Sequence, residues 1–259
     1  RGTSPKQRNC RVGPLCDDGL HNAYIHLFAQ SGSGILENCE LFRLGVGSAW
    51  AERPDRNPKL GIEFRGCATA NFMRVTGNEI HHCPVGVFFY KSHGQDTHSE
   101  DERIADNEIH HCEVGLMCYG GLHHMTISGN HIHHNQTGMI HGGGCAEDVI
   151  SGVITKNVFQ QNEVALHITK NGAKSAHIRH NTYSDNDTAI ILDTSSATLQ
   201  NETINGGRIG IQLTDSGGGS LVKCRIGVEA PNTVANILAE TEKGRLILRA
   251  CTLGGPTKI

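Results

Sequence analysis

Residues 104–116 read IADNEIHHCEVGL, and residues 127–139 read ISGNHIHHNQTGM. Both stretches place an Asn three positions after an apolar residue, a second apolar residue two positions further on, and a Gly just before the last apolar residue. The same frame, with substitutions, begins at residues 36, 75, 154, 178, 199, 221 and 248. Self-similarity at intervals of about 20 to 50 residues is typical of solenoid folds.

The apolar runs inside each repeat are short and alternate with polar residues, which predicts strands rather than helices. A coil of about 22 residues cannot bury a core alone, but stacked coils ~4.8 Å apart share one continuous interior. A leucine-rich repeat would need an amphipathic helix in each unit, and no helical period of useful length is present. We therefore predict an all-β parallel β-helix (solenoid) of about nine coils over residues 26–259, with residues 1–25 as an N-terminal segment or cap.

The repeat resembles the pectate-lyase-like superfamily of parallel β-helix repeats over about residues 35–255. Residues 34–38 (GILEN) and 197–207 (ATLQNETINGG) resemble the CASH repeats of some F-box proteins, SHC SH2-domain-binding proteins and NosD-type proteins. This resemblance implies a right-handed β-helix. It implies little about function, because the superfamily contains lyases, hydrolases, epimerases, tail spikes and non-catalytic interaction modules. No F-box is visible, so no role in ubiquitin ligation follows.

The composition is that of a globular chain. Hydrophobic residues make up 37% and charged residues 19%, and the formal net charge is −3 without a long basic run. Nucleic acid is therefore not expected as the main partner, because phosphate binding usually needs a positive field. No apolar stretch is long enough for a transmembrane helix, so no membrane association is expected.

Ten cysteines occur without a single CxxC pair. We predict that most are single buried thiols, which favours a reducing intracellular compartment. Cys10 and Cys16 are close enough in sequence for a disulfide or for part of a metal site. Cys83 and Cys112 occupy the repeat position that holds Asn in later coils, which indicates a place in a stacked ladder rather than a nucleophile.

Paired histidines follow the repeat Ile in three successive coils, at 81–82, 110–111 and 133–134. In register, each row stacks imidazoles about 4.8 Å apart at the Cα atoms, where neighbouring rings could converge on one metal ion. Repetition of a tolerated polar residue between neighbouring coils is the simpler explanation of the rows. We predict no cofactor, and name His81, His110 and His133 as the residues that would bind a metal. Close stacking also predicts lowered histidine pKa values and a loss of stability between about pH 7 and pH 5.

The outward positions of the strand after the repeat Gly are unusually apolar. A contiguous apolar strip normally has a cover, which could be the insertion at 91–103, the N-terminal segment or a partner. We predict a protein-binding surface here, made of Phe88, Tyr90, Met117, Tyr119, Ile140, His167 and Ile191.

Two insertions interrupt the repeat, at about 48–60 and 91–103. The second insertion mixes acidic, basic and imidazole side chains beside the apolar strip. A lyase would need a base and cations that stabilise an enolate, and a hydrolase would need two carboxyl groups. If the protein is an enzyme, the candidate catalytic residues are Lys91, His93, Asp96, His98 and Arg103. A solvated acidic loop is the structural alternative.

Two functional hypotheses follow from these features. The first is a non-catalytic scaffold or macromolecule-binding module within a larger protein or assembly, with a protein partner or a neighbouring domain on the apolar strip or the end coils. Few aromatic residues and the lack of a catalytic signature favour it. The alternative is a carbohydrate-active enzyme, namely a polysaccharide lyase, hydrolase or epimerase that uses a groove beside loop 91–103.

Overall fold

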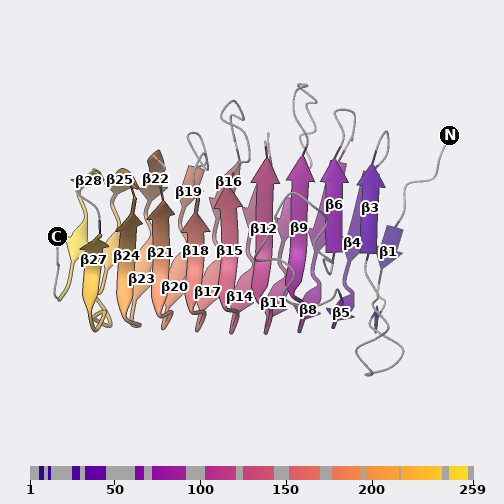
Figure 1. The fold of residues 1–259 in the computed structure, drawn as a ribbon, viewed down its shortest axis with the longest axis horizontal. Coiled ribbons are helices and arrows are strands. Elements are labelled where there is room, and N and C mark those ends of the chain that lie inside the picture. The colour runs from indigo at the N-terminus through magenta and orange to yellow at the C-terminus, as the bar shows by residue number, and fades with distance from the viewer. Residues whose placement is uncertain are drawn as a thin grey trace.

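Strands stack coil upon coil along one axis, with the two ends of the chain at opposite ends of the stack (Figure 1). The computed structural model describes residues 6–8, 11–12, 25–29, 33–44, 62–66, 72–91, 103–120, 125–142, 152–169, 177–193, 196–215, 217–240 and 245–255. Within them, all strand pairs are parallel and form three sheets of ten, ten and nine strands. The predicted all-β parallel β-helix is confirmed.

The chain visits the three sheets in a fixed order, so that β1–β27 make nine coils and β28 and β29 begin a tenth. Sheet A contains β1 (Lys6–Arg8), β4 (Ser33–Glu37), β7 (Phe72–Thr76), β10 (Arg103–Ala105), β13 (Thr126–Ser128), β16 (Val153–Thr155), β19 (His177–Arg179), β22 (Ser196–Gln200), β25 (Gly218–Val222) and β28 (Leu246–Arg249). Sheet B contains β2 (Arg11–Val12), β5 (Glu40–Phe42), β8 (Glu79–His81), β11 (Glu108–His110), β14 (His131–His133), β17 (Val158–Gln160), β20 (Thr182–Ser184), β23 (Thr203–Asn205), β26 (Arg225–Ile226) and β29 (Thr252–Leu253). Sheet C contains β3 (Ile25–Ala29), β6 (Ile62–Gly66), β9 (Val85–Lys91), β12 (Val114–Gly120), β15 (Thr137–Gly142), β18 (Val164–Ile168), β21 (Thr188–Asp193), β24 (Ile209–Thr214) and β27 (Ala235–Ala239).

The ends of the chain join the same architecture. Strands β1 and β2 lie within the segment 1–25 and pair in parallel with β4 and β5 of the second coil. The predicted insertion at 48–60 lies outside the described residues, as do Cys10 and Cys16. No helix in the described part of the chain is long and apolar enough to cross a membrane.

The core is built from columns of equivalent apolar residues, one from each coil. Ile104 of sheet A, Ile109 of sheet B and Leu116 of sheet C are each no more than 1% exposed and stand in register with equivalent residues above and below. Because successive strand residues point to opposite faces, one apolar residue in two is enough to fill the interior. The repeat Gly has a steric cause: a Cβ added to Gly115 would lie 2.7 Å from the backbone oxygen of Gly138 in the next coil.

A buried ladder of asparagines lies at the turn between sheets A and B. Asn107 donates from Nδ2 to the backbone oxygen of Val75 at 2.9 Å and to Oδ1 of Asn130 at 2.8 Å. The Asn130 Oδ1 also accepts from the backbone N–H of Asn107 at 3.1 Å. The same pattern links Asn78, Asn107, Asn130, Asn157 and Asn181. Each amide thus serves backbone groups that the turn would otherwise leave unpaired.

Cysteines replace asparagines in parts of these ladders. Cys83 and Cys112 are buried at the turn between sheets B and C, where the next coils hold Asn135, Asn162 and Asn186. Among the described residues, Cys83, Cys112, Cys118, Cys224 and Cys251 are free thiols. The predicted ladder position of Cys83 and Cys112 is therefore confirmed.

Candidate functional site

The candidate site lies on the outer surface at the turn between sheets B and C. His82, His111 and His134 occupy this turn with φ values of 55°, 53° and 53°. This left-handed conformation is uncommon for residues other than Gly, and His is among the side chains that tolerate it. The backbone N–H of His82 donates to the His110 oxygen at 3.3 Å, so the turn is held to the next coil. The strained backbone points these imidazoles outward.

The histidines form two stacked rows, as the repeat register predicts. His110 stacks on His81 with ring centroids 5.0 Å apart and on His133 at 4.9 Å. The outer row stacks likewise, with 5.1 Å between His82 and His111 and 5.3 Å between His111 and His134. Sheet register therefore holds six imidazoles in a fixed array across three coils.

Each coil also couples its two imidazoles directly. The Nδ1 atoms are 2.7 Å apart in the pairs His81–His82, His110–His111 and His133–His134. One Nδ1 must donate and the other accept, so a pair with a proton on every nitrogen would place two N–H groups against each other.

Three of these imidazoles have lowered pKa values. Burial is the largest cause at each of His82, His110 and His133, and the positive charges of neighbouring histidines lower the pKa further. Hydrogen bonds that the Glu79 and Glu108 carboxylates accept from His110 and His133, respectively, raise the pKa of these two histidines. Burial and the charges of neighbouring histidines therefore favour the neutral form of His82, His110 and His133, in which an imidazole can accept a hydrogen bond or bind a metal ion.

Carboxylates from the preceding coil approach the inner histidine row. Glu40 Oε1 lies 3.6 Å from His81 Nε2, and Glu79 Oε1 lies 3.5 Å from His110 Nε2. The shortest of these contacts joins Glu108 Oε1 and His133 Nε2 at 3.1 Å. Each glutamate lies one coil before the histidine that it contacts and two strand positions earlier in the register, so the contacts run diagonally between coils.

A groove of about 540 Å³ follows the turn across four coils. Its lining residues are His82, His111, Cys112, Glu113, His134, Asn135, Gln136, Gln161 and Glu163. Outward-facing side chains alternate with the buried ladder residues, so the groove has an imidazole and amide wall on one side and a carboxylate and amide wall on the other. We call this the turn groove.

The carboxylate wall of the turn groove is a column in register. Thr137 N–H donates to the Glu113 oxygen at 2.8 Å and Val164 N–H to the Gln136 oxygen at 2.9 Å, so Glu113, Gln136 and Glu163 follow one another coil by coil. Two coil steps separate the glutamates, which corresponds to ~9.6 Å between their Cα atoms. No Lys or Arg lines the groove within the described residues.

The candidate catalytic residues of the insertion lie elsewhere. Lys91 ends β9 at the far end of the strand from the turn groove, and Arg103 begins β10 in sheet A. His93, Asp96 and His98 lie outside the described residues. The described part of the chain therefore brings none of the five into the turn groove.

The apolar strip on sheet C is partly covered by the chain itself. Phe88 is 2% exposed and Met117 is 3% exposed, and both pack with Val85 and Val114 in a second cluster outside the main core. Ile140, His167 and Ile191 are half-buried. Tyr90 and Tyr119 are backbone neighbours in the sheet. A protein-binding role of the strip remains a prediction.

Sequence reasoning missed Glu108, Glu113, His131 and Glu163. The signal was present: Glu40, Glu79, Glu108 and His131 occupy one repeat position, and Glu113, Gln136 and Glu163 occupy another. Reading each outward position down the coils, rather than the histidine rows alone, would have found both columns.

Comparison with known proteins identifies the family. A family model described as "Right handed beta helix region" matches residues 18–175 and, in an overlapping match, residues 94–204. The chain belongs to the right-handed β-helix family. The handedness implied by the sequence resemblance is thus confirmed. A search of curated proteins finds no match.

Several solved structures share this β-helix. XylC in complex with xylose has 13% identity and a TM-score of 0.62, and the match covers 87% of this chain and 40% of that one. The catalytic unit of a GH87 α-1,3-glucanase from Streptomyces thermodiastaticus has 15% identity and a TM-score of 0.57, with 89% and 50% covered. A double mutant of the periplasmic alginate epimerase AlgG has 11% identity and a TM-score of 0.58, with 96% and 69% covered. These identities show a common fold alone, and the chain spans half or less of the first two proteins.

Proposed function

We propose that the chain is a carbohydrate-active β-helix module that binds an oligosaccharide along the turn groove. The observation that carries the proposal is a polar groove that crosses four coils and receives at least one hydrogen-bonding side chain from each of them. An extended chain of pyranose rings advances by a distance similar to the ~4.8 Å coil step, so successive rings would meet equivalent groups.

The groups that line the groove suit sugar hydroxyls. Glu113 and Glu163 accept hydrogen bonds, while Gln136 and Gln161 both donate and accept. The imidazoles on the opposite wall can also donate or accept hydrogen bonds through their ring nitrogens. Structural neighbours named as an α-1,3-glucanase, an alginate epimerase and a protein complexed with xylose support a sugar ligand, although they resemble this chain in fold alone.

The charge of the groove narrows the substrate class. A uronate lyase or epimerase needs cations near the sugar carboxylate to stabilise the enolate. The described lining supplies two carboxylates and no Lys or Arg, which favours a neutral oligosaccharide.

The two glutamates also suit hydrolysis. An inverting glycoside hydrolase uses two carboxyl groups about 6.5–9.5 Å apart, one as general acid and one as the base for water. The Cα atoms of Glu113 and Glu163 are two coil steps, or ~9.6 Å, apart, and side chains that lean towards each other would bring the two carboxyl groups into that range. Hydrolysis of a neutral glycan therefore fits this pair better than a lyase or epimerase reaction does.

The test is a panel of neutral and acidic oligosaccharides measured by calorimetry for binding and by reducing-end assay for turnover. We expect a neutral oligosaccharide to bind, with affinity reduced at least about tenfold in Glu163→Gln, since a charged hydrogen bond contributes about 1.5–3 kcal/mol. The exposed Glu240, outside the groove, provides the control Glu240→Gln, which should bind as wild type does. Wild type should release reducing ends from the oligosaccharide that it binds, and Glu113→Gln should release none.

The non-catalytic hypothesis predicts a different result. Binding of a sugar without product would reject hydrolysis and leave a carbohydrate-binding module. Folded protein that binds no member of the panel would reject the proposal as a whole, and the scaffold role would become the better reading.

A further inference from the structure

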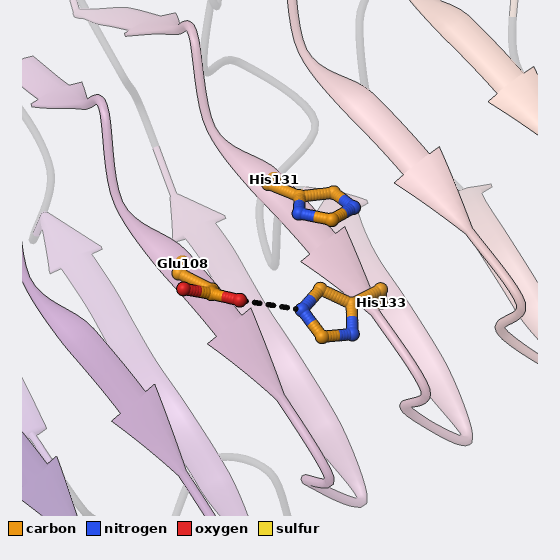
Figure 2. A group of neighbouring side chains, drawn as sticks. All are labelled: Glu108, His131 and His133. Carbon is orange, nitrogen blue, oxygen red and sulfur yellow. Dashed lines mark hydrogen bonds and ion pairs between the residues drawn. The ribbon is translucent and has the colours of Figure 1, made fainter.

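A second candidate site lies on the outer face of sheet B, beside the turn groove but not within its lining. The ligand-type atoms of Glu108, His131 and His133 all lie within 4.8 Å of one another. Figure 2 shows the two imidazoles side by side on β14, with the Glu108 carboxylate of β11 facing the His133 ring. Three groups of metal-binding type therefore converge from two adjacent strands.

We propose that Glu108, His131 and His133 bind one divalent transition-metal ion of the zinc class and leave at least one coordination position open. Two imidazoles and one carboxylate suit zinc and its neighbours in the first transition row better than calcium or magnesium, which prefer oxygen ligands. A set of three protein ligands leaves a position for water or a ligand group. The site does not depend on the proposed sugar binding.

The distances already approach those of a metal site. Two ligands bound ~2.0–2.1 Å from a tetrahedral zinc ion are about 3.3 Å apart. His133 Nε2 and Glu108 Oε1 are 3.1 Å apart, so only a small movement would admit the ion between them. The ring centroids of His131 and His133 are 4.3 Å apart, with planes inclined by 34°, which leaves their nitrogens free to turn towards a shared ion.

Neighbouring side chains supply the outer hydrogen bonds that ligating histidines usually need. His133 Nδ1 is 2.7 Å from His134 Nδ1, so a proton on His133 Nδ1 can be donated there while Nε2 binds the ion. His131 Nε2 is 3.4 Å from Gln160 Oε1, an acceptor that favours a proton on Nε2 and leaves Nδ1 as the ligand. Without metal, the His133 proton can move to Nε2 and bond to Glu108 instead.

The register explains why this coil differs from its neighbours. The pairs Glu40–His81 and Glu79–His110 repeat the same diagonal contact at 3.6 and 3.5 Å. The position two residues before the histidine holds Glu79 in the first of these coils and Glu108 in the second. In the next coil the same position holds His131. Within the described residues, this substitution alone assembles three ligand-type groups so closely.

The neighbouring coils provide matched variants. His131→Thr removes the third ligand and introduces the residue found at the same position in β20, Thr182. Glu108→Gln weakens the carboxylate ligand. Glu79→Gln makes the same change one coil earlier, at a pair that lacks the second imidazole. All variants are tested as full-length protein without a His-tag, and circular dichroism verifies the fold.

Calorimetry with Zn²⁺ at pH 7.5 tests the proposal. We expect wild type and Glu79→Gln to bind one equivalent of Zn²⁺ tightly. His131→Thr and Glu108→Gln should bind this equivalent at least about tenfold more weakly or not at all. Substitution with Co²⁺ should give the visible bands of a four- or five-coordinate ion in wild type, and these bands should be lost in His131→Thr.

Three outcomes would overturn the site. The site would be rejected if wild type bound no Zn²⁺ tightly. It would also be rejected if His131→Thr bound Zn²⁺ with the affinity of wild type. Equal weakening in Glu79→Gln would show that zinc binds the histidine face in general rather than this cluster. None of these outcomes bears on sugar binding, which is measured separately.

Discussion

The inner asparagine ladder and the outer histidine rows are both columns of equivalent polar side chains, but the first is buried and the second lies at the surface. Both stack one polar side chain per coil in the third to fifth coils. Asn107 and Asn130 are 2% and 1% exposed, and their amides bond to backbone groups as well as to each other. His111 and His134 are exposed, and Gln161 and Asp185 hold the same turn position in later coils.

The difference separates what the fold requires from what it permits. A buried amide that leaves its backbone partners unpaired is costly, so the Asn position has few substitutes. The outer turn needs only a residue that tolerates a left-handed conformation, and histidine is one of several. Because the fold does not require these imidazoles or the glutamates beside them, they are the better candidates for function.

The sharpest way to break this comparison is Asn130→Ala. The change leaves the backbone oxygen of Ile104 and the amides of Asn107 and Asn157 short of partners, so we expect a loss of about 3 kcal/mol in the free energy of unfolding. Urea titration measures it. The control His111→Asn should change stability by less than ~0.5 kcal/mol, and equal effects at both positions would contradict the distinction.

His141 tests an inner position that lies outside the ladder. It is 1% exposed and stacks in register between Cys118 and Ile168, and neither ring nitrogen has a hydrogen-bond partner in the described structure. Burial lowers its pKa from 6.5 to about 4. We expect His141→Leu to stabilise the protein by about 2 kcal/mol at pH 7, because an unpaired polar group leaves the core.

The pH dependence of His141 has a definite sign. Between pH 6.5 and about 4 the unfolded chain takes up a proton that the folded state refuses, so wild-type stability should fall as pH falls through this range. Unfolding measured at pH 7 and pH 5 should show a smaller loss in His141→Leu. Identical losses in the two proteins would mean that this imidazole is not held neutral.

Glu202 is the acidic end of the asparagine ladder. It accepts from the Asn181 backbone N–H at 3.2 Å, and burial raises its pKa to about 8. The folded state holds this proton above the ordinary pKa of 4.5, so its contribution to stability should be lost as pH rises from 4.5 to about 8. We expect Glu202→Gln to lose less stability than wild type between pH 4.5 and pH 8, which urea titrations at the two pH values would measure.

The smallest effect is expected on the outer rows. His110→Gln should change the stability at pH 7.5 by less than ~0.5 kcal/mol. Because burial and the charge of His133 lower the His110 pKa, acidification from 6.5 should destabilise wild type more than the variant. NMR titration of the imidazole protons provides a direct reading. A His110 pKa above the ordinary value would contradict close stacking of neutral rings.

The sequence predicts the core better than the surface for a physical reason. Inward positions repeat because equivalent side chains must pack in the same interior space in every coil. The apolar repeat at Ile104, Ile109 and Leu116 is therefore visible in the sequence. The His rows and their spacing also follow from register. The diagonal contacts of Glu79 and Glu108 depend on side-chain rotamers, and the turn groove depends on the profile of a turn. The repeat frame specifies neither, so both were missed.

A coil of this protein contacts little beyond the coil above and the coil below, and that has an evolutionary consequence. Duplication of one repeat, such as residues 104–126, would lengthen the turn groove and the histidine rows by one step and leave their cross-section unchanged. Deletion of one repeat would shorten them equally. The capacity of the surface can therefore change in whole units, by recombination rather than by the slow replacement of single residues.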